Sequence, residues 1–479
     1  MGNSSLKQQT VRGTIWSSIE RFSVQGIQFL VLIVMARILT PADYGMVGML
    51  AIFLAISQSL IDSGFSNALI QKIDRTEKDF STVFYFNLIV GCALYGILYF
   101  CAPLIAAFYK TPELIPITRV ISLLLIINSL SVVQRAIFTI RIDFKTQAKA
   151  SLIAVVISGV LGIMMAYSGF GVWALVVQSV VNNGINVAML WVLSSWKPRW
   201  VFSTESFRQL FAFGSKLMLV GIIDTLYKNI YTIVIGKKYS SADLGFYTRA
   251  EQFVQFPTAN LTGIMQRVTF PVLSQLQHDN ARLSEAYRKI LRMTTFIVFP
   301  LCVGLACIAR PLVLTLLNEN WEPSVKFLQI LCFACLLYPV HVINLNLLQV
   351  KGRTDLSLII SIEQKVVAAL VLIVTIPMGL IPLCVGQIVI SVLILIINTH
   401  FTGRLIRIGL LSQLKDITPA FVYSGIMGGG IYFLMQLSHS NLGQLVIGIF
   451  GGMIIYTGAA VIGKSFEIRE LYAIIKRIR

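Results

Sequence analysis

Long runs of apolar residues alternate with short polar connections along almost the whole chain. A helix needs about 20 mostly apolar residues to cross the hydrocarbon core of a bilayer. By this criterion the sequence predicts an all-α membrane protein with fourteen membrane-spanning helices. They cover residues 15–38, 44–70, 80–102, 117–138, 150–168, 172–193, 213–235, 247–272, 293–316, 324–348, 357–377, 382–402, 417–437 and 442–462.

The polar connections between these runs differ in charge in a regular way. Most basic residues outside the spans lie in the odd-numbered connections, counting the N-terminus as the first, and Lys72, Arg75 and Lys78 form one such group. The even-numbered connections hold only Lys110, Lys237 and Lys238. Basic loops remain on the cytoplasmic side of a membrane. We therefore expect both termini to be cytoplasmic.

Composition agrees with a membrane protein and excludes several other classes. Of 479 residues, 56% are hydrophobic and 13% are charged, whereas soluble proteins carry about 25% charged residues. The net charge of +18 reflects orientation in the membrane, so we expect no nucleic-acid partner. The connections are too short to form a catalytic domain, which argues against an enzyme. All seven cysteines lie within predicted spans, and we expect neither a metal site nor an organic cofactor.

Short motifs recur about 200 residues apart. Ala42-Asp43-Tyr44-Gly45 returns as Ala242-Asp243-Leu244-Gly245, and Arg141-Ile142-Asp143 returns as Arg353-Thr354-Asp355. Their matching order predicts two six-helix repeats, which are parallel because six is an even number of crossings. The expected organisation is an N-terminal six-helix bundle at 1–205, a second six-helix bundle at 206–403, and two additional helices with a cytoplasmic tail at 404–479.

Ionisable residues within the predicted spans are the candidates for function, because a charge at membrane depth is costly unless it faces a polar cavity or a partner. The acidic ones are Glu20, Asp62, Asp224, Glu251 and Glu363. The basic ones are more numerous: Arg21, Arg37, Arg119, Arg135, Lys216, Lys228, Arg249, Arg267, Arg310, Lys326 and Lys365. Arg37, Arg119, Arg135 and Lys326 lie close to helix ends, and we expect them to extend toward the lipid headgroups.

The predicted helix 213–235 carries the densest group of polar residues. Asp224 and Lys228 are four residues apart and share a face, and Tyr227 and Tyr231 repeat this spacing beside them. Two interpretations remain open: a structural ion pair, or residues that line a cavity. Together with Asp62 and the charges on the helix 247–272, the excess of basic groups favours a cavity for a large, anionic, hydroxyl-rich solute.

The chain resembles the polysaccharide-exporter branch of the multidrug/oligosaccharidyl-lipid/polysaccharide exporter superfamily, and within it the O-antigen and colanic-acid-exporter-like flippases. Four stretches carry the resemblance. They are Gly13-Thr14-Ile15-Trp16, residues 36–45 (ARILTPADYG), residues 62–71 (DSGFSNALIQ) and residues 169–175 (GFGVWAL).

The resemblance implies two six-helix lobes in a V around a cationic central cavity, in the bacterial inner membrane. It implies a flippase for undecaprenyl-diphosphate-linked oligosaccharide repeat units, used in surface polysaccharide assembly and driven by a proton or sodium gradient. Membrane lipids, a polysaccharide polymerase and a chain-length regulator are the further expected partners.

Specific roles follow for the candidate residues under this hypothesis. We expect the basic ones to attract the anionic substrate and the two tyrosines to stack on sugar rings, and we expect the two aspartates to serve ion coupling or to hold the cations in place. The substrate-binding candidates are Arg21, Lys216, Lys228, Arg249, Arg267, Tyr227 and Tyr231, and the ion-coupling candidates are Asp62 and Asp224.

Two alternatives stay open. A drug/cation antiporter of the same superfamily would need a cavity dominated by acidic groups, which the basic excess opposes. A membrane polysaccharide polymerase would need a large external loop with catalytic residues, and the external connections of this chain are short.

Overall fold

The computed structural model describes residues 3–62, 64–470 and 472. Every regular element in this described part is a helix. The chain divides into two compact units, Met1–Gly245 and Phe246–Arg479. The predicted all-α class is therefore confirmed.

The helices of the N-terminal unit are α1 (Asn3–Ile38), α2 (Pro41–Asp62), α3 (Phe65–Gln71), α4 (Glu77–Tyr109), α5 (Leu114–Ile121), α6 (Leu123–Ser129), α7 (Val132–Ile140), α8 (Phe144–Tyr167), α9 (Val172–Leu193) and α10 (Thr204–Lys238). The first five residues of α11 (Ser241–Gln275) also belong to this unit.

The remaining helices of the C-terminal unit are α12 (Asn280–Cys307), α13 (Ala309–Leu316), η1 (Glu319–Trp321), α14 (Ser324–Cys335), α15 (Tyr338–Val350), α16 (Thr354–Thr375), η2 (Ile376–Met378), α17 (Leu380–Ile406), α18 (Leu410–Met435) and α19 (Asn441–Ile462). α10 packs on α2, α3 and α4 in the N-terminal unit. The predicted division at 205 and 403 was based on the sequence repeat and stays a prediction.

Twelve helical stretches of the described residues are long and apolar enough to cross a membrane. They overlap twelve of the predicted spans. The other two predictions, residues 15–38 and 247–272, fall on α1 and α11, which are helical but are not among the twelve; Phe22–Ile38 of α1 is a shorter apolar stretch. The chain is thus a multi-pass membrane protein, while the count of fourteen and the repeat layout stay predictions.

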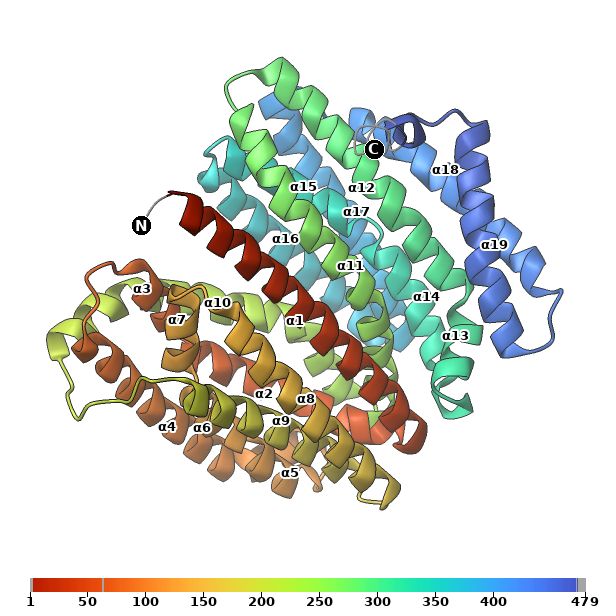
Figure 1. Ribbon diagram of the computed structural model, residues 1–479. Coiled ribbons are helices and arrows are strands. Elements are labelled where there is room, and N and C mark those ends of the chain that lie inside the picture. The colour runs from red at the N-terminus through yellow and green to blue at the C-terminus, as the bar shows by residue number, and fades with distance from the viewer. Residues whose placement is uncertain (1–2, 63, 471, 473–479) are drawn as a thin grey trace. The chain divides into compact units, whose positions relative to one another are not determined.

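Three helices of the N-terminal unit pack side by side: α1 packs along α8, and α8 packs along α9 (Figure 1). Two glycines of α8 allow this close approach. A Cβ atom on Gly159 would lie 2.6 Å from Val31 Cγ2 of α1, and one on Gly162 would lie 3.0 Å from Gln178 Cβ of α9. Small residues serve this purpose in membranes, where lipid is as apolar as leucine and helices associate by close packing.

The recurring Ala-Asp-Tyr-Gly and Ala-Asp-Leu-Gly motifs form equivalent turns. In the first turn of α2, the Asp43 carboxylate accepts hydrogen bonds from Thr40 N (2.9 Å) and Thr40 Oγ1 (2.7 Å). In the first turn of α11, the Asp243 carboxylate accepts hydrogen bonds from Ser240 N (3.2 Å) and Ser240 Oγ (2.7 Å). Each aspartate thus caps the start of its own helix in the same way.

The two glycines of these motifs bring the starts of α2 and α11 into reciprocal contact. A Cβ atom on Gly45 would lie 1.7 Å from the Ser241 carbonyl oxygen, and one on Gly245 would lie 1.9 Å from the Pro41 carbonyl oxygen. No other residue type fits at either position without a backbone shift. The recurrence of glycine in the two motifs therefore has a steric reason.

Replacing Gly45 by alanine tests this contact. Because the new methyl group meets backbone atoms that cannot rotate away, Gly45→Ala should lower the free energy of unfolding by about 1–3 kcal/mol. Thermal unfolding of the purified protein in detergent measures the change. The matched control is Gly96→Ala on α4, where no atom lies within 4 Å of the added Cβ. Equal stability of the two variants would contradict the close approach of α2 and α11.

Candidate functional site

A stripe of carboxamide side chains runs along α9. Gln178, Asn182 and Asn186 are spaced by four residues and therefore share one helix face, and Asn183 lies beside them. Asn182 Nδ2 donates to the buried Ser158 Oγ of α8 at 2.9 Å. This hydrogen bond fixes the polar face of α9 against α8.

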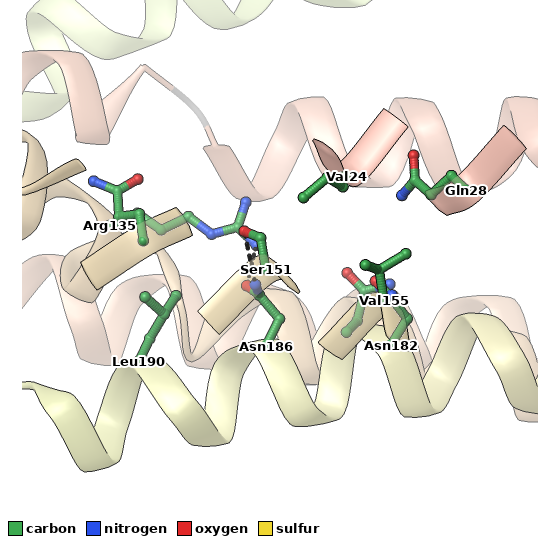
Figure 2. A pocket seen from close by; sticks show the side chains of 10 residues that line it. Val24, Gln28, Arg135, Ser151, Val155, Asn182, Asn186 and Leu190 are labelled. Carbon is green, nitrogen blue, oxygen red and sulfur yellow. Dashed lines mark hydrogen bonds between the residues drawn. The ribbon is translucent and has the colours of Figure 1, made fainter. Parts of the chain in front are cut away.

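The stripe meets a cation that α7 supplies. Arg135 Nη2 donates to Asn186 Oδ1 at 3.2 Å, and Asn186 Nδ2 donates to Ser151 Oγ of α8 at 3.3 Å. Figure 2 shows the Arg135 side chain extending toward Asn186 and Ser151. The guanidinium is therefore held at a fixed place among α7, α8 and α9.

A cavity of about 220 Å³ opens at this point and is called here the Asn186 cavity. Gln28 of α1 contributes to its wall (Figure 2). Its full lining is Val24, Gln28, Arg135, Gln147, Ser151, Val155, Asn182, Asn183, Asn186 and Leu190. Arg135 is the charged group in this lining, and no carboxylate is among these described residues.

A second cavity, of about 280 Å³, shares Arg135 and Asn183 with the first and is called the Asp62 cavity. Its lining is Gln58, Asp62, Ser66, Asn128, Ser131, Val132, Arg135 and Asn183. Gln58 Nε2 donates to Asp62 Oδ1 at 3.1 Å, and Asn128 Nδ2 donates to Gln58 Oε1 at 2.9 Å. A chain of amides thus fixes the carboxylate in the wall.

The two cavities have similar hydrogen-bonding groups and different charge. Carboxamides and hydroxyls both donate and accept, and they dominate both linings. The Asn186 cavity carries the single positive charge of Arg135, whereas Arg135 and Asp62 offset each other in the Asp62 cavity. Such a surface can bind a solute rich in hydroxyl groups.

One residue predicted from the sequence, Asp62, lines this site. On α10, Asp224, Tyr227 and Tyr231 are half-buried and Lys228 is exposed, and none of the four belongs to the lining of either cavity. The side chains of Arg21, Lys216 and Arg267 lie outside the described residues.

Arg249 is buried within the C-terminal unit, with 3% of its surface exposed. Its Nη1 donates to Gln252 Oε1 at 2.8 Å, and the guanidinium carbon lies 5.6 Å from the centre of the Trp321 ring. This is a cation–π arrangement within the packed interior. No group of three or more metal-binding side chains occurs in the described part of the chain.

Sequence reasoning assigned Arg135 to the lipid headgroups because it lies near the end of a predicted span. The structure places it in the wall of both cavities, and its reach toward the headgroups stays a prediction. The spacing of Gln178, Asn182 and Asn186 was the available signal, since a face of amides in an otherwise apolar membrane helix indicates a polar interior. Gln28, Gln58 and Asn128 gave no such pattern.

Comparison with solved structures identifies the class of fold. The chain resembles the lipid II flippase MurJ in an inward closed conformation, with a TM-score of 0.77 and 15% identity, covering 96% of this chain and 100% of the other. It also resembles an inward-facing multidrug resistance MATE family transporter of the MOP superfamily, with a TM-score of 0.60 and 17% identity over 82% and 99% of the two chains. The fold is that of this group of transporters.

Relatives in sequence narrow the class to a family. The chain is 26% identical to the teichuronic acid biosynthesis protein TuaB of Bacillus subtilis, over 94% of this chain and 95% of the relative. It is 25% identical to the lipopolysaccharide biosynthesis protein WzxC of Escherichia coli, over 74% and 72%. Residues 34–326, more than half of the chain, match the family described as polysaccharide biosynthesis protein. The chain belongs to that family, and the resemblance inferred from the sequence motifs is confirmed.

Water access to the site can be tested with cysteine labelling. In a variant whose seven native cysteines are replaced by alanine, Asn183→Cys should react quickly with an anionic methanethiosulfonate reagent, because the reactive thiolate forms in a wet, cationic cavity. The control, Ile89→Cys, replaces an exposed apolar residue near the middle of α4 and should react slowly. Mass spectrometry of timed samples gives both rates, and equal rates would exclude a hydrated cavity.

Proposed function

We propose that this protein is a flippase that moves lipid-linked oligosaccharides, carried on undecaprenyl diphosphate, across the bacterial inner membrane for surface polysaccharide assembly. Membership of the polysaccharide biosynthesis family supports the pathway. The likeness in fold to a lipid flippase supports the type of transport.

The two cavities that share Arg135 carry the proposal. A sugar loses its hydrogen bonds to water when it enters a membrane, and this loss is costly unless protein groups replace them. The amides of α1, α2, α6, α8 and α9 offer such groups inside a bundle of apolar helices. A protein that only anchors to a membrane has no need for this polar interior.

Transport proceeds by alternating access and is coupled to a proton or sodium gradient in this proposal. Asp62 and Asp224 are the candidate coupling groups. Arg21, Lys216, Lys228, Arg249 and Arg267 attract the diphosphate, and Tyr227 and Tyr231 stack on sugars. The basic connections favour cytoplasmic termini, and membrane lipids, a polymerase and a chain-length regulator are the proposed partners.

A drug/cation antiporter is the second candidate, because a carboxylate, Asp62, lines a polar cavity in a fold shared with multidrug transporters. Arg135 in the same wall disfavours an organic cation, since like charges repel. Both candidates are transporters, so neither requires a catalytic centre.

Reconstitution into vesicles tests the proposed function. Protein-containing vesicles loaded with an undecaprenyl-diphosphate-linked oligosaccharide should expose the sugar to an external glycosidase faster than protein-free vesicles. The rate should fall when an ionophore collapses the proton or the sodium gradient. Translocation of the fluorescent cation rhodamine 6G without translocation of the oligosaccharide would support the antiporter instead.

Replacing the amide shared by both cavities tests where the oligosaccharide passes. Asn183→Leu removes hydrogen bonds to the passing sugar worth about 1–3 kcal/mol, so the initial rate should drop roughly fivefold to 150-fold. Gln436→Leu removes an exposed amide at the end of α18 and should leave the rate unchanged. If the two variants transported equally well, the cavities of the N-terminal unit would not lie on the path.

A further inference from the structure

The Asn186 cavity and the adjoining Asp62 cavity differ in charge. On the Asn186 side, Arg135 is accompanied by uncharged amides and Ser151. On the Asp62 side, the same guanidinium faces a cavity that also contains a carboxylate. An anionic group is attracted to the first side and repelled by Asp62 on the second.

Arginine is suited to one kind of anion in particular. Its planar guanidinium presents N–H donors in a fork that matches the two oxygens of a carboxylate. In this protein Asn186 accepts from Nη2 at 3.2 Å, and Ser151 in turn holds Asn186 at 3.3 Å. The fork is therefore positioned before any ligand arrives, which lowers the entropy lost on binding.

The remaining lining matches sugar hydroxyls. Gln28, Gln147, Asn182 and Asn183 surround the Asn186 cavity, and each carboxamide can both donate to and accept from a hydroxyl. The volume of about 220 Å³ accommodates a single sugar residue better than an extended oligosaccharide. The adjoining Asp62 cavity, of about 280 Å³, has room for a second sugar residue.

We propose that the Asn186 cavity is a subsite for an acidic sugar, whose carboxylate binds Arg135, and that the Asp62 cavity takes a neutral sugar next to it. This inference rests on the proposed function and specifies its substrate: oligosaccharide units that contain a uronic acid or a similar carboxylated sugar. Arg135 is a specificity-determining residue in this account.

The diphosphate of the carrier lipid is the other possible source of an anion. It bears more than one negative charge, and Arg135 is the one cation among the described residues that line the two cavities. The diphosphate is also tethered to a prenyl tail that stays in lipid. The lining of both cavities, in contrast, comes from the helices of one bundle. The site therefore favours the sugar carboxylate.

The experiment compares two lipid-linked disaccharides that differ in one group. One carries glucuronosyl-glucose and the other carries cellobiose, which has a hydroxymethyl group in place of the carboxylate; both carry the same diphosphate and prenyl chain. In vesicles, the wild-type protein should move the acidic substrate on the order of tenfold faster at low concentration, since only this substrate can form a charge-assisted hydrogen bond with Arg135.

Arg135→Gln keeps a hydrogen-bonding side chain and removes the charge. It should abolish the preference between the two substrates while still transporting the cellobiose form, which also shows that the variant is folded. Arg208→Gln removes an exposed charge of α10 outside both cavities and should retain the preference.

Three results would overturn the inference. The first is equal transport of both substrates by the wild-type protein, and the second is an unchanged preference in Arg135→Gln. The third is loss of both substrates in Arg135→Gln together with competition by inorganic diphosphate in the wild type, which would assign Arg135 to the carrier diphosphate. In the first two cases the proposed flippase function stands; if the wild-type protein moves neither substrate, that function fails as well.

Discussion

A guanidinium among membrane-spanning helices must find polar partners on those same helices, and the N-terminal unit depends on this constraint at Arg135. A charged side chain within the apolar part of a membrane is costly unless polar groups or water surround it. The hydrogen bond from Arg135 to Asn186 and that from Asn186 to Ser151 join α7, α9 and α8. A rotation or a shift of one turn in any of these helices would remove the partners. The polar chain therefore fixes the register of the helices that form the cavities.

The cavities also depend on close contacts between helices at glycine residues. Gly159 lets Val31 of α1 approach α8, so that Gln28 of the same helix reaches the Asn186 cavity. Gly45 and Gly245 let the starts of α2 and α11 touch backbone to backbone. α2 carries Gln58 and Asp62 at its other end, in the wall of the second cavity. The position of the polar groups thus follows from apolar and glycine contacts several turns away.

The sequence predicted the parts of this structure that depend on local patterns. Apolar runs of about 20 residues located the helices, and the repeated Asp43 and Asp243 motifs located two equivalent capped turns. Asp62 was predicted at the site because a carboxylate within a membrane span is costly. A single acidic residue in an apolar run therefore already indicates a polar environment. The place of Arg135 in the cavity walls was not predicted, because the distance of a residue from a helix end says nothing about which helices face it. Asn128 and Gln58 were missed because isolated amides carry no charge, and only packing brings α2 and α6 together.

Two arginines of α12 in the C-terminal unit show that a basic residue on a helix can serve packing without forming an anion site. Arg288 donates from Nε and Nη2 to the two carboxylate oxygens of Asp416 at 2.7 Å, and Arg292 donates to Glu467 at 2.7 Å. These cations are engaged in holding helices and the segment after α19 together, and breaking such a pair leaves a charge that is costly to bury. A binding site requires a cation next to uncharged hydrogen-bonding groups and an open volume. Arg135 also joins helices, but it lines an open volume beside carboxamides and a hydroxyl in the Asn186 cavity, and Asp62 enters only the second cavity. We therefore expect the substrate selectivity of this protein to depend on it more than on the total positive charge.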